Sequence, residues 1–244
     1  MRGHGARIAP DMLRTTALIL CAMTACATAL AAPQTVTASY DVRLNGLNVA
    51  TVNERYEARD GTYRLASSSE PMGLFALVKK LAVRFTSTGE VTGTGLRPRQ
   101  FEGRRATGEA PEVVAEFDWA GSRLALTHDG KTEALALPPG TQDRLSVMYQ
   151  FMFVAPELTS QLAVAVTNGR RIDRYVYTVT PDVEQDTPLG RLRTVHLVRL
   201  REPGDPENEI WLAPEHGYVP VRMIIVERDG TRYEQLIAKL DLQP

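Results

Sequence analysis

Apolar and polar residues alternate along most of this chain, which is the two-residue period of a strand with one buried face. The first run extends from Val36 to Leu44 and ends at Asn45-Gly46, a strong signal for a two-residue hairpin turn. Further alternating runs are separated by Asp-Gly pairs at positions 60–61, 129–130 and 229–230. Because these hairpins follow one another without intervening helices, the pattern predicts one large antiparallel sheet.

A sheet with this many strands must curl or close on itself to protect its edges. We therefore expect a mainly β fold, built as a large curled antiparallel sheet or a partly open β-barrel with one or two helices against its concave face. Residues 32–244 contain no linker rich in Pro, Gly or Ser, so we expect them to form a single antiparallel β domain.

Two segments break the strand pattern, and the first has the spacing of an amphipathic helix. Its apolar residues are Leu74, Leu77, Val78 and Leu81. Lys79 and Lys80 lie on the opposite side of such a helix. The helix could act as a movable lid over the mouth of the sheet, bind a ligand there or touch a membrane surface. Packing in the core is the alternative interpretation.

The second segment, residues 142–155, follows Pro138-Pro139-Gly140 and predicts a helix with Thr141 as its N-cap and Asp143 near its positive end. One side carries Leu145, Met148, Tyr149 and Met152, while Val147, Phe151 and Val154 cover the other side. A helix that is apolar nearly all round is expected to be buried, here inside the curled sheet. Met148, Tyr149 and Met152 are candidate ligand contacts because methionine adapts to irregular apolar ligands; plain core packing is again the alternative.

Residues 1–31 predict a signal peptide. Arg2, Arg7 and Arg14 precede a short apolar run, and Ala29-Leu30-Ala31 has the A-x-A pattern of a cleavage site. We therefore expect export to the periplasm, with no membrane-spanning helix after cleavage. A lipoprotein processed and acylated at Cys26 is the alternative, and Met12 is a second candidate start codon.

Both cysteines lie inside this leader, so the mature chain is expected to have no disulfide and no thiol nucleophile. Without residues 1–31 the chain keeps 25 basic and 28 acidic side chains, a net charge of −3. A nucleic-acid-binding protein normally carries a basic face, so this charge argues against nucleic acid as a partner.

Few residues are candidates for catalysis. His128, His196 and His216 lie in three different segments, without the spacing of a metal site or a catalytic triad. Glu184 and Asp186 would share one face of a strand, as acidic residues on exposed faces commonly do. We therefore predict no catalytic residue, no metal site and no cofactor.

One local basic cluster contains Arg97, Arg99, Arg104 and Arg105, with Phe101 between them. Arginine pairs well with phosphate oxygens, so this cluster could contact anionic groups such as lipid headgroups or acidic glycans. A solvated strand face balanced by nearby glutamates is the alternative interpretation.

The most distinctive segment runs from Glu184 to Arg222. It contains Thr187-Pro188-Leu189-Gly190, Thr194-Val195, Ile210-Trp211-Leu212-Ala213 and Tyr218-Val219-Pro220-Val221. Together with Asp143-Arg144-Leu145 and Tyr149, this segment resembles the domain-of-unknown-function 3108 family of uncharacterised exported bacterial proteins. The resemblance implies a shared sheet framework and carries no catalytic residue. By fold analogy alone, lipoprotein carriers of the Lol fold also wrap a curled sheet around helices.

Three functions are compatible with these features. The first is non-enzymatic binding of an apolar or amphipathic ligand, such as a lipid, an acyl chain or a lipoprotein. The second is a cell-envelope scaffold that contacts a partner protein. The third is an envelope hydrolase in which His196 or two carboxylates converge in a cleft. A cavity beside the 142–155 helix would favour the first function, and a filled interior would favour the second.

Overall fold

The computed structural model describes residues 32–77, 82–105, 108, 110–155 and 160–244. The expected signal peptide at 1–31, with its alternative at Cys26, lies outside the described residues. Val78, Leu81 and the lysines between them also lie outside, so the second half of the first expected helix is not described.

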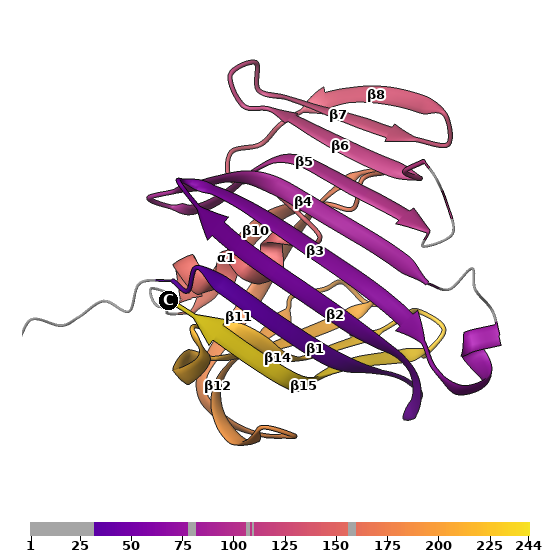
Figure 1. Ribbon diagram of the computed structural model, residues 1–244, viewed down its shortest axis with the longest axis vertical. Coiled ribbons are helices and arrows are strands. Elements are labelled where there is room, and N and C mark those ends of the chain that lie inside the picture. Colours follow the sequence, from indigo (N-terminus) through magenta and orange to yellow (C-terminus); the bar gives the residue numbers. More distant parts are fainter. Residues whose placement is uncertain (1–31, 78–81, 106–107, 109, 156–159) are drawn as a thin grey trace, which may run out of the picture. The chain divides into compact units, whose positions relative to one another are not determined.

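In the described ranges, fifteen strands form one sheet, in the order β8-β7-β6-β5-β4-β3-β2-β1-β15-β14-β13-β12-β11-β10-β9 (Figure 1). The strands are β1 Thr35–Leu44, β2 Leu47–Arg59, β3 Thr62–Pro71, β4 Val83–Thr92, β5 Gly95–Arg105, β6 Val113–Asp118, β7 Arg123–His128, β8 Lys131–Ala136, β9 Gln142–Asp143, β10 Gln161–Thr167, β11 Ile172–Thr187, β12 Gly190–Arg199, β13 Glu207–Ala213, β14 Val219–Val226 and β15 Arg232–Gln243. The helices are η1 Gly73–Leu77, α1 Ser146–Val154 and η4 Pro214–His216.

The sheet consists of two meanders that β1 and β15 join by antiparallel pairing. Neighbouring strands are antiparallel, except that the short β9 runs parallel to β10. The edge strands β8 and β9 do not pair with each other, so the sheet curls without closing into a barrel. The expected fold class is therefore confirmed.

Turns and bulges shape this sheet as the sequence pattern predicts. Asn45 and Gly46 both have positive φ, 47° and 86°, which a two-residue turn between β1 and β2 requires. Register shifts interrupt five strand pairs, including β1 with β15 and β4 with β5. Each shift bends the strand that carries it and increases the local twist, which helps the sheet to curl.

The helix α1 lies on the concave side, between the two meanders (Figure 1). Tyr149 and Met152 pack with residues of the first meander, such as Tyr56 and Leu65. On its other side, α1 packs against residues of the second meander, among them Leu197, Ile210 and Leu212. Two apolar surfaces therefore enclose the helix, which explains why it is apolar nearly all round.

Two details of the expected helices differ from the structure. α1 begins at Ser146 instead of 142, because Gln142 and Asp143 pair with β10 as a short strand. Thr141 is not the N-cap, since its hydroxyl donates to the carbonyl of Pro138 at 2.7 Å. The described part of the first expected helix is the short 3-10 helix η1, in which no residue is buried.

None of the helices in the described ranges has the length and hydropathy needed to span a membrane.

Candidate ligand-binding cavity

A cavity of about 560 Å³ occupies the part of the concave interior that α1 does not fill. Strand register places its wall at one end of the sheet: Val42 near the end of β1 faces Ala50 near the start of β2. At the join of β14 and β15, Met223 and Gln235 pair in the same way. The start of α1 supplies another side through Leu145, Val147 and Met148.

The wall of the cavity is mainly apolar. Its aliphatic and aromatic side chains are Val42, Ala50, Val52, Val83, Phe85, Leu145, Val147, Met148, Val166, Tyr175, Tyr177, Met223, Ile225 and Tyr233. Such a lining with a few polar groups is typical of small-molecule sites, and the volume falls within their usual range of about 300–1,000 Å³.

A buried carboxylate fastens the start of α1 to the sheet. Asp143 Oδ1 accepts hydrogen bonds from the backbone N–H groups of Leu145 at 2.9 Å and Ser146 at 2.8 Å. Its Oδ2 accepts the Ser87 hydroxyl at 2.6 Å, and Ser87 is hydrogen-bonded to the Tyr63 hydroxyl at 3.0 Å. Burial raises the pKa of Asp143, while these hydrogen bonds oppose that shift. The network fixes the start of α1 against β3 and β4. It therefore also fixes the side of the cavity that α1 forms.

A second carboxyl group, Glu54 of β2, lies in the cavity wall. It accepts hydrogen bonds from the hydroxyls of Tyr149 at 3.0 Å and Ser67 at 3.1 Å. Burial raises the pKa of Glu54, and these two hydrogen bonds and the charge of Arg144 lower it in part. Glu54 therefore links the middle of α1 to the strands β2 and β3.

Arg144 is the basic residue of the cavity wall. Its guanidinium lies over the ring of Phe85, 4.5 Å from the ring centre. Arg144 is exposed to solvent, although the protein around its guanidinium lowers the pKa of the group by desolvation. Among the described residues, the guanidinium forms no hydrogen bond and no ion pair. Its charge interacts with Asp143 and Glu54 only over a distance.

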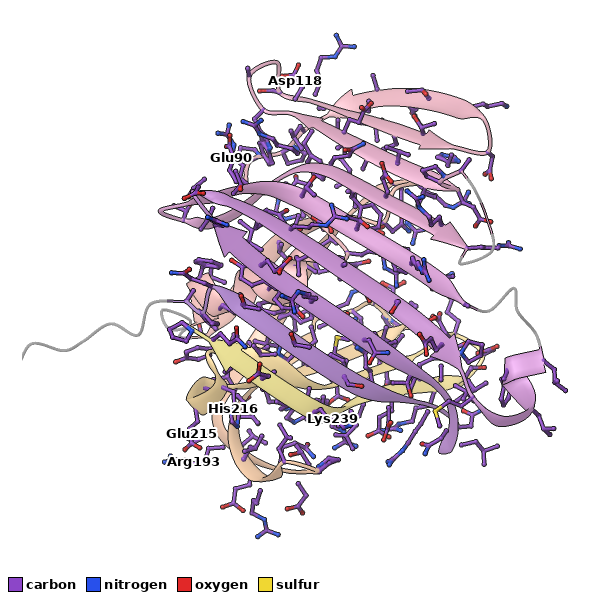
Figure 2. All side chains as sticks on the ribbon, viewed as in Figure 1. Glu90, Asp118, Arg193, Glu215, His216 and Lys239 are labelled. Carbon is purple, nitrogen blue, oxygen red and sulfur yellow. The ribbon has the colours of Figure 1, made fainter. Side chains whose placement is uncertain are left out.

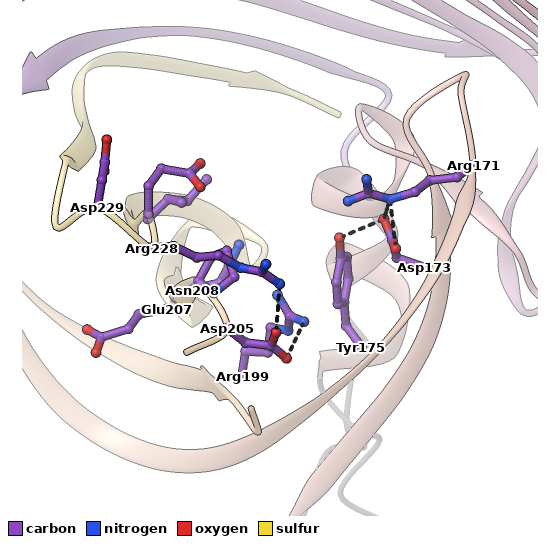
Figure 3. A pocket seen from close by; sticks show the side chains of 12 residues that line it. Arg171, Asp173, Tyr175, Arg199, Asp205, Glu207, Asn208, Arg228 and Asp229 are labelled. Carbon is purple, nitrogen blue, oxygen red and sulfur yellow. Dashed lines mark hydrogen bonds and ion pairs between the residues drawn. The ribbon is translucent and has the colours of Figure 1, made fainter. Parts of the chain in front are cut away.

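A polar groove of about 910 Å³ adjoins the cavity (Figure 3). The two share Asp173, Tyr175, Asn208 and Ile225 in their linings. The arginines of the groove are paired: Arg171 with Asp173 at 2.9 Å, and Arg228 with Asp205 at 3.2 Å. The side-chain oxygen of Asn208 is buried at the junction and has no hydrogen-bond partner among the described residues. The groove thus offers a polar approach to an apolar interior.

Exposed apolar side chains collect at the same end of the sheet as the cavity. They are Leu47, Met72, Leu74, Phe75, Leu77, Leu200 and Tyr233. All of them lie in the turns or strand ends after β1, β3 and β12 and before β15. Leu74 and Leu77 on η1 are the most exposed, at 84% and 82%. We call this set the apolar rim.

The structure separates the expected ligand contacts. Met148 lines the cavity, whereas Tyr149 and Met152 pack in the core, where Tyr149 also holds Glu54. Leu74 and Leu77 belong to the apolar rim and do not line the cavity. Two residues of the wall, Glu54 and Arg144, were not expected from the sequence. For Arg144, the available signal was a charge directly before the uncharged, mainly apolar segment from Leu145 to Val154.

The histidines lie outside the cavity wall. His196 pairs in register with Trp211 on the face of β12 opposite Leu197, the residue that packs with α1. Its ring stacks on Trp211 at 4.2 Å and its Nε2 is 2.8 Å from Glu209. His216 lies in η4 next to Glu215 (Figure 2), and His128 is hydrogen-bonded to Asp129 at 3.2 Å.

The expected anion-binding arginines lie along strand β5, and each has a carboxylate partner. Arg97 and Arg99 pair with Glu90, which Figure 2 labels on β4. Arg104 pairs with Glu102 and Arg105 with Glu112, both at 2.7 Å. Anion contact by this cluster stays a prediction. Among the described residues, no three His, Cys, Asp or Glu side chains converge as a metal site would require.

One solved structure has a similar architecture. A crystal structure of a β-barrel-like protein of domain of unknown function DUF1849 from Brucella abortus is similar to the chain, with a TM-score of 0.56 at 12% identity. The match covers 88% of this chain and 100% of the other. A domain from Vibrio parahaemolyticus, described as an outer membrane lipoprotein-sorting protein, matches with a TM-score of 0.26 at 8% identity, over 86% of this chain and 85% of its own.

No curated protein matches the sequence. A family model described as "Protein of unknown function (DUF3108)" matches residues 39–237, which include every strand from β2 to β14 and the whole of α1. The chain therefore belongs to the DUF3108 family.

Proposed function

We propose that this protein binds an apolar or amphipathic ligand, such as the acyl chain of a lipid or lipoprotein, in the interior cavity and catalyses no reaction on it. The observation that supports this function is the cavity of about 560 Å³ with a mainly apolar wall. Each ligand methylene that moves from water into such a site would contribute ~0.8 kcal/mol.

The residues divide into two sets in this proposal. Met148 contacts the bound chain, because its flexible thioether lines the cavity. Leu74 and Leu77 of the apolar rim contact a chain that enters or leaves at that end of the sheet. Tyr149 and Met152 act indirectly, since they hold α1 in the core beside the cavity.

The expected signal peptide would deliver the protein to the periplasm, where lipids and lipoproteins of the envelope are available as ligands. A binding protein in that compartment needs an interior shielded from water, and the curled sheet with α1 inside it provides one.

Two measurements test the function. Organic extracts of the purified protein are analysed by mass spectrometry for lipids that co-purify with it. Binding of 1-aminoanthracene, a neutral dye that fluoresces in apolar sites, is titrated in parallel. We expect lipid in the extracts and saturable dye binding. Clean extracts without dye binding would contradict the proposal.

A variant that fills the cavity links binding to this site. Ala50 lines the cavity from β2, so Ala50→Phe should occupy its volume and abolish dye binding. Asn53→Phe is the matched control, since Asn53 lies on the same strand and is exposed on the other face. If both variants bind the dye equally well, the dye binds outside the cavity and the proposal is wrong about the site.

The two other functions have less support. A filled interior would have favoured the scaffold function. Because the interior contains a cavity, that argument does not apply. A hydrolase would need His196 or two carboxylates in a cleft, whereas His196 is packed between Trp211 and Glu209 on the other face of the sheet. Glu54 and Asp143 are both engaged in hydrogen bonds that hold α1.

A further inference from the structure

We infer that the ligand of the cavity carries an anionic headgroup, a carboxylate or a phosphate, which pairs with the guanidinium of Arg144. This inference rests on the proposed function and names the class of ligand for the same cavity.

Arg144 supplies hydrogen-bond donors for which the described residues provide no acceptor. A guanidinium has five N–H donors in a planar fork. Among the described residues, its neighbour is the face of Phe85, which holds the group in place but accepts no ordinary hydrogen bond. In the empty cavity, water can satisfy these donors. An apolar chain that displaces this water would leave a buried charge without a partner, unless the ligand itself brings an acceptor.

The nearby carboxylates do not satisfy Arg144. Both oxygens of Asp143 already accept hydrogen bonds, from the start of α1 and from Ser87. Both oxygens of Glu54 accept hydroxyl groups, from Tyr149 and Ser67. Since burial raises the pKa of Glu54, its negative charge is also disfavoured in this site. A ligand headgroup would therefore meet N–H groups of Arg144 that no described residue accepts.

The position of Arg144 fits an amphipathic ligand. Tyr175, which lines both the polar groove and the cavity, is close enough to interact electrostatically with Arg144. A headgroup at Arg144 would thus lie near the groove, while its chain extends along Val52, Val83 and Met148. The groove arginines differ, because Arg171, Arg199 and Arg228 already pair with Asp173 or Asp205 (Figure 3).

Guanidinium chemistry selects the headgroup. The planar fork matches two oxygens of a carboxylate or phosphate at once, and such charge-assisted bonds are about twice as strong as neutral ones. An alcohol of the same chain length offers a single neutral oxygen. The cavity should therefore distinguish an acid from its alcohol, although both bury the same chain.

The experiment compares three ligands that share one chain. Dodecanoate, dodecyl phosphate and dodecanol displace 1-aminoanthracene from the full-length mature protein, from Arg144→Met and from Arg55→Met. Arg55 is the matched control because it lies next to Glu54 on β2, faces outward and pairs with Glu57 at 2.6 Å. In the wild type and in Arg55→Met, we expect the better of the two anions to bind about 10- to 100-fold more tightly than dodecanol.

In Arg144→Met, the preference should disappear while dodecanol binds as before. Preference for dodecanoate would identify fatty acids, and preference for dodecyl phosphate would identify phosphate-headed lipids; either result supports the inference. Equal binding of acid and alcohol by the wild type overturns it without affecting the proposed function. Failure of all three ligands to bind the wild type overturns both. The wild-type comparison is decisive even if Arg144→Met does not fold.

Discussion

Asp143 gives the sharpest test of how α1 is held in the sheet. The carboxylate accepts hydrogen bonds from Leu145 N–H, Ser146 N–H and the Ser87 hydroxyl, and both Asp143 and Ser87 have no accessible surface. Asp143→Ala removes the acceptor and leaves two buried backbone N–H donors without partners, while the Ser87 hydroxyl keeps only its contact with Tyr63. We expect the free energy of unfolding to fall because water cannot easily replace the lost acceptor.

The size of the effect follows from these contacts. An unsatisfied buried donor destabilises by roughly 1–3 kcal/mol, so the two backbone donors together give about 2–6 kcal/mol. Typical domains have about 5–15 kcal/mol of stability, so the variant should unfold far more easily. Asp143→Asn should lose less, about 1–2 kcal/mol, because its amide oxygen still accepts both backbone N–H groups and only the contact with Ser87 changes.

Urea unfolding followed by circular dichroism measures both variants. Asp186→Ala is the control, since Asp186 is exposed on β11 and pairs with Arg191 at the surface. The expected order of stability is wild type and Asp186→Ala, then Asp143→Asn, then Asp143→Ala. If Asp143→Ala unfolds at the same urea concentration as Asp186→Ala, the hydrogen-bond network does not anchor α1 and the reasoning fails.

Three further variants test other parts of the structure. Burial raises the pKa of Glu54, so the folded protein binds this proton more tightly, and stability declines as pH rises from about 4.5, the unfolded value, through the raised folded value. Asp143, whose pKa burial also raises, contributes a decline of the same sign. In Glu54→Gln the decline should therefore become smaller in urea titrations at several pH values, and an unchanged pH dependence would refute this prediction. Gly89→Ala places a Cβ against the carbonyl oxygen of Arg97 and 2.8 Å from the Cα of Pro98, both in β5, and should destabilise by about 1–3 kcal/mol, whereas Gly93→Ala, with open space around it, should not. The double variant Leu74→Ser/Leu77→Ser should leave the urea midpoint unchanged, because both side chains are exposed, but should slow dye entry in stopped flow if the apolar rim guides the ligand.

Local sequence patterns predicted the sheet because its turns and strands depend on near neighbours. The alternation from Val36 to Leu44 and the positive-φ pair Asn45-Gly46 are both properties of adjacent residues. The start of α1 was misassigned for the opposite reason. Thr141 has the chemistry of an N-cap, but Asp143 finds a partner in Ser87, 56 residues away, and pairing with β10 draws Gln142 and Asp143 into a strand.

The cavity was harder still to predict from the sequence, because it forms between residues that lie far apart in the chain. Met148 could be named as a ligand contact because helical spacing placed it on one apolar stripe. Glu54 could not, because its role follows from Tyr149, which lies 95 residues away and reaches it only after the sheet has curled. Neither the curvature nor the unfilled part of the interior follows from the two-residue period, since alternation shows which face is buried but not against what.

The segment Asp143-Arg144-Leu145, which carried part of the family resemblance, combines structural roles with one residue that stability does not explain. Asp143 fastens the helix, Leu145 fills the core and Tyr149 holds Glu54. Arg144 contacts the ring of Phe85, but its side chain is exposed and no described residue pairs with it. A leucine or methionine at this position could make the same ring contact without placing a charge in a mainly apolar wall. Residues that depart from the local pattern are most often found where a protein binds something, so the guanidinium is better explained by the contents of the cavity than by its walls.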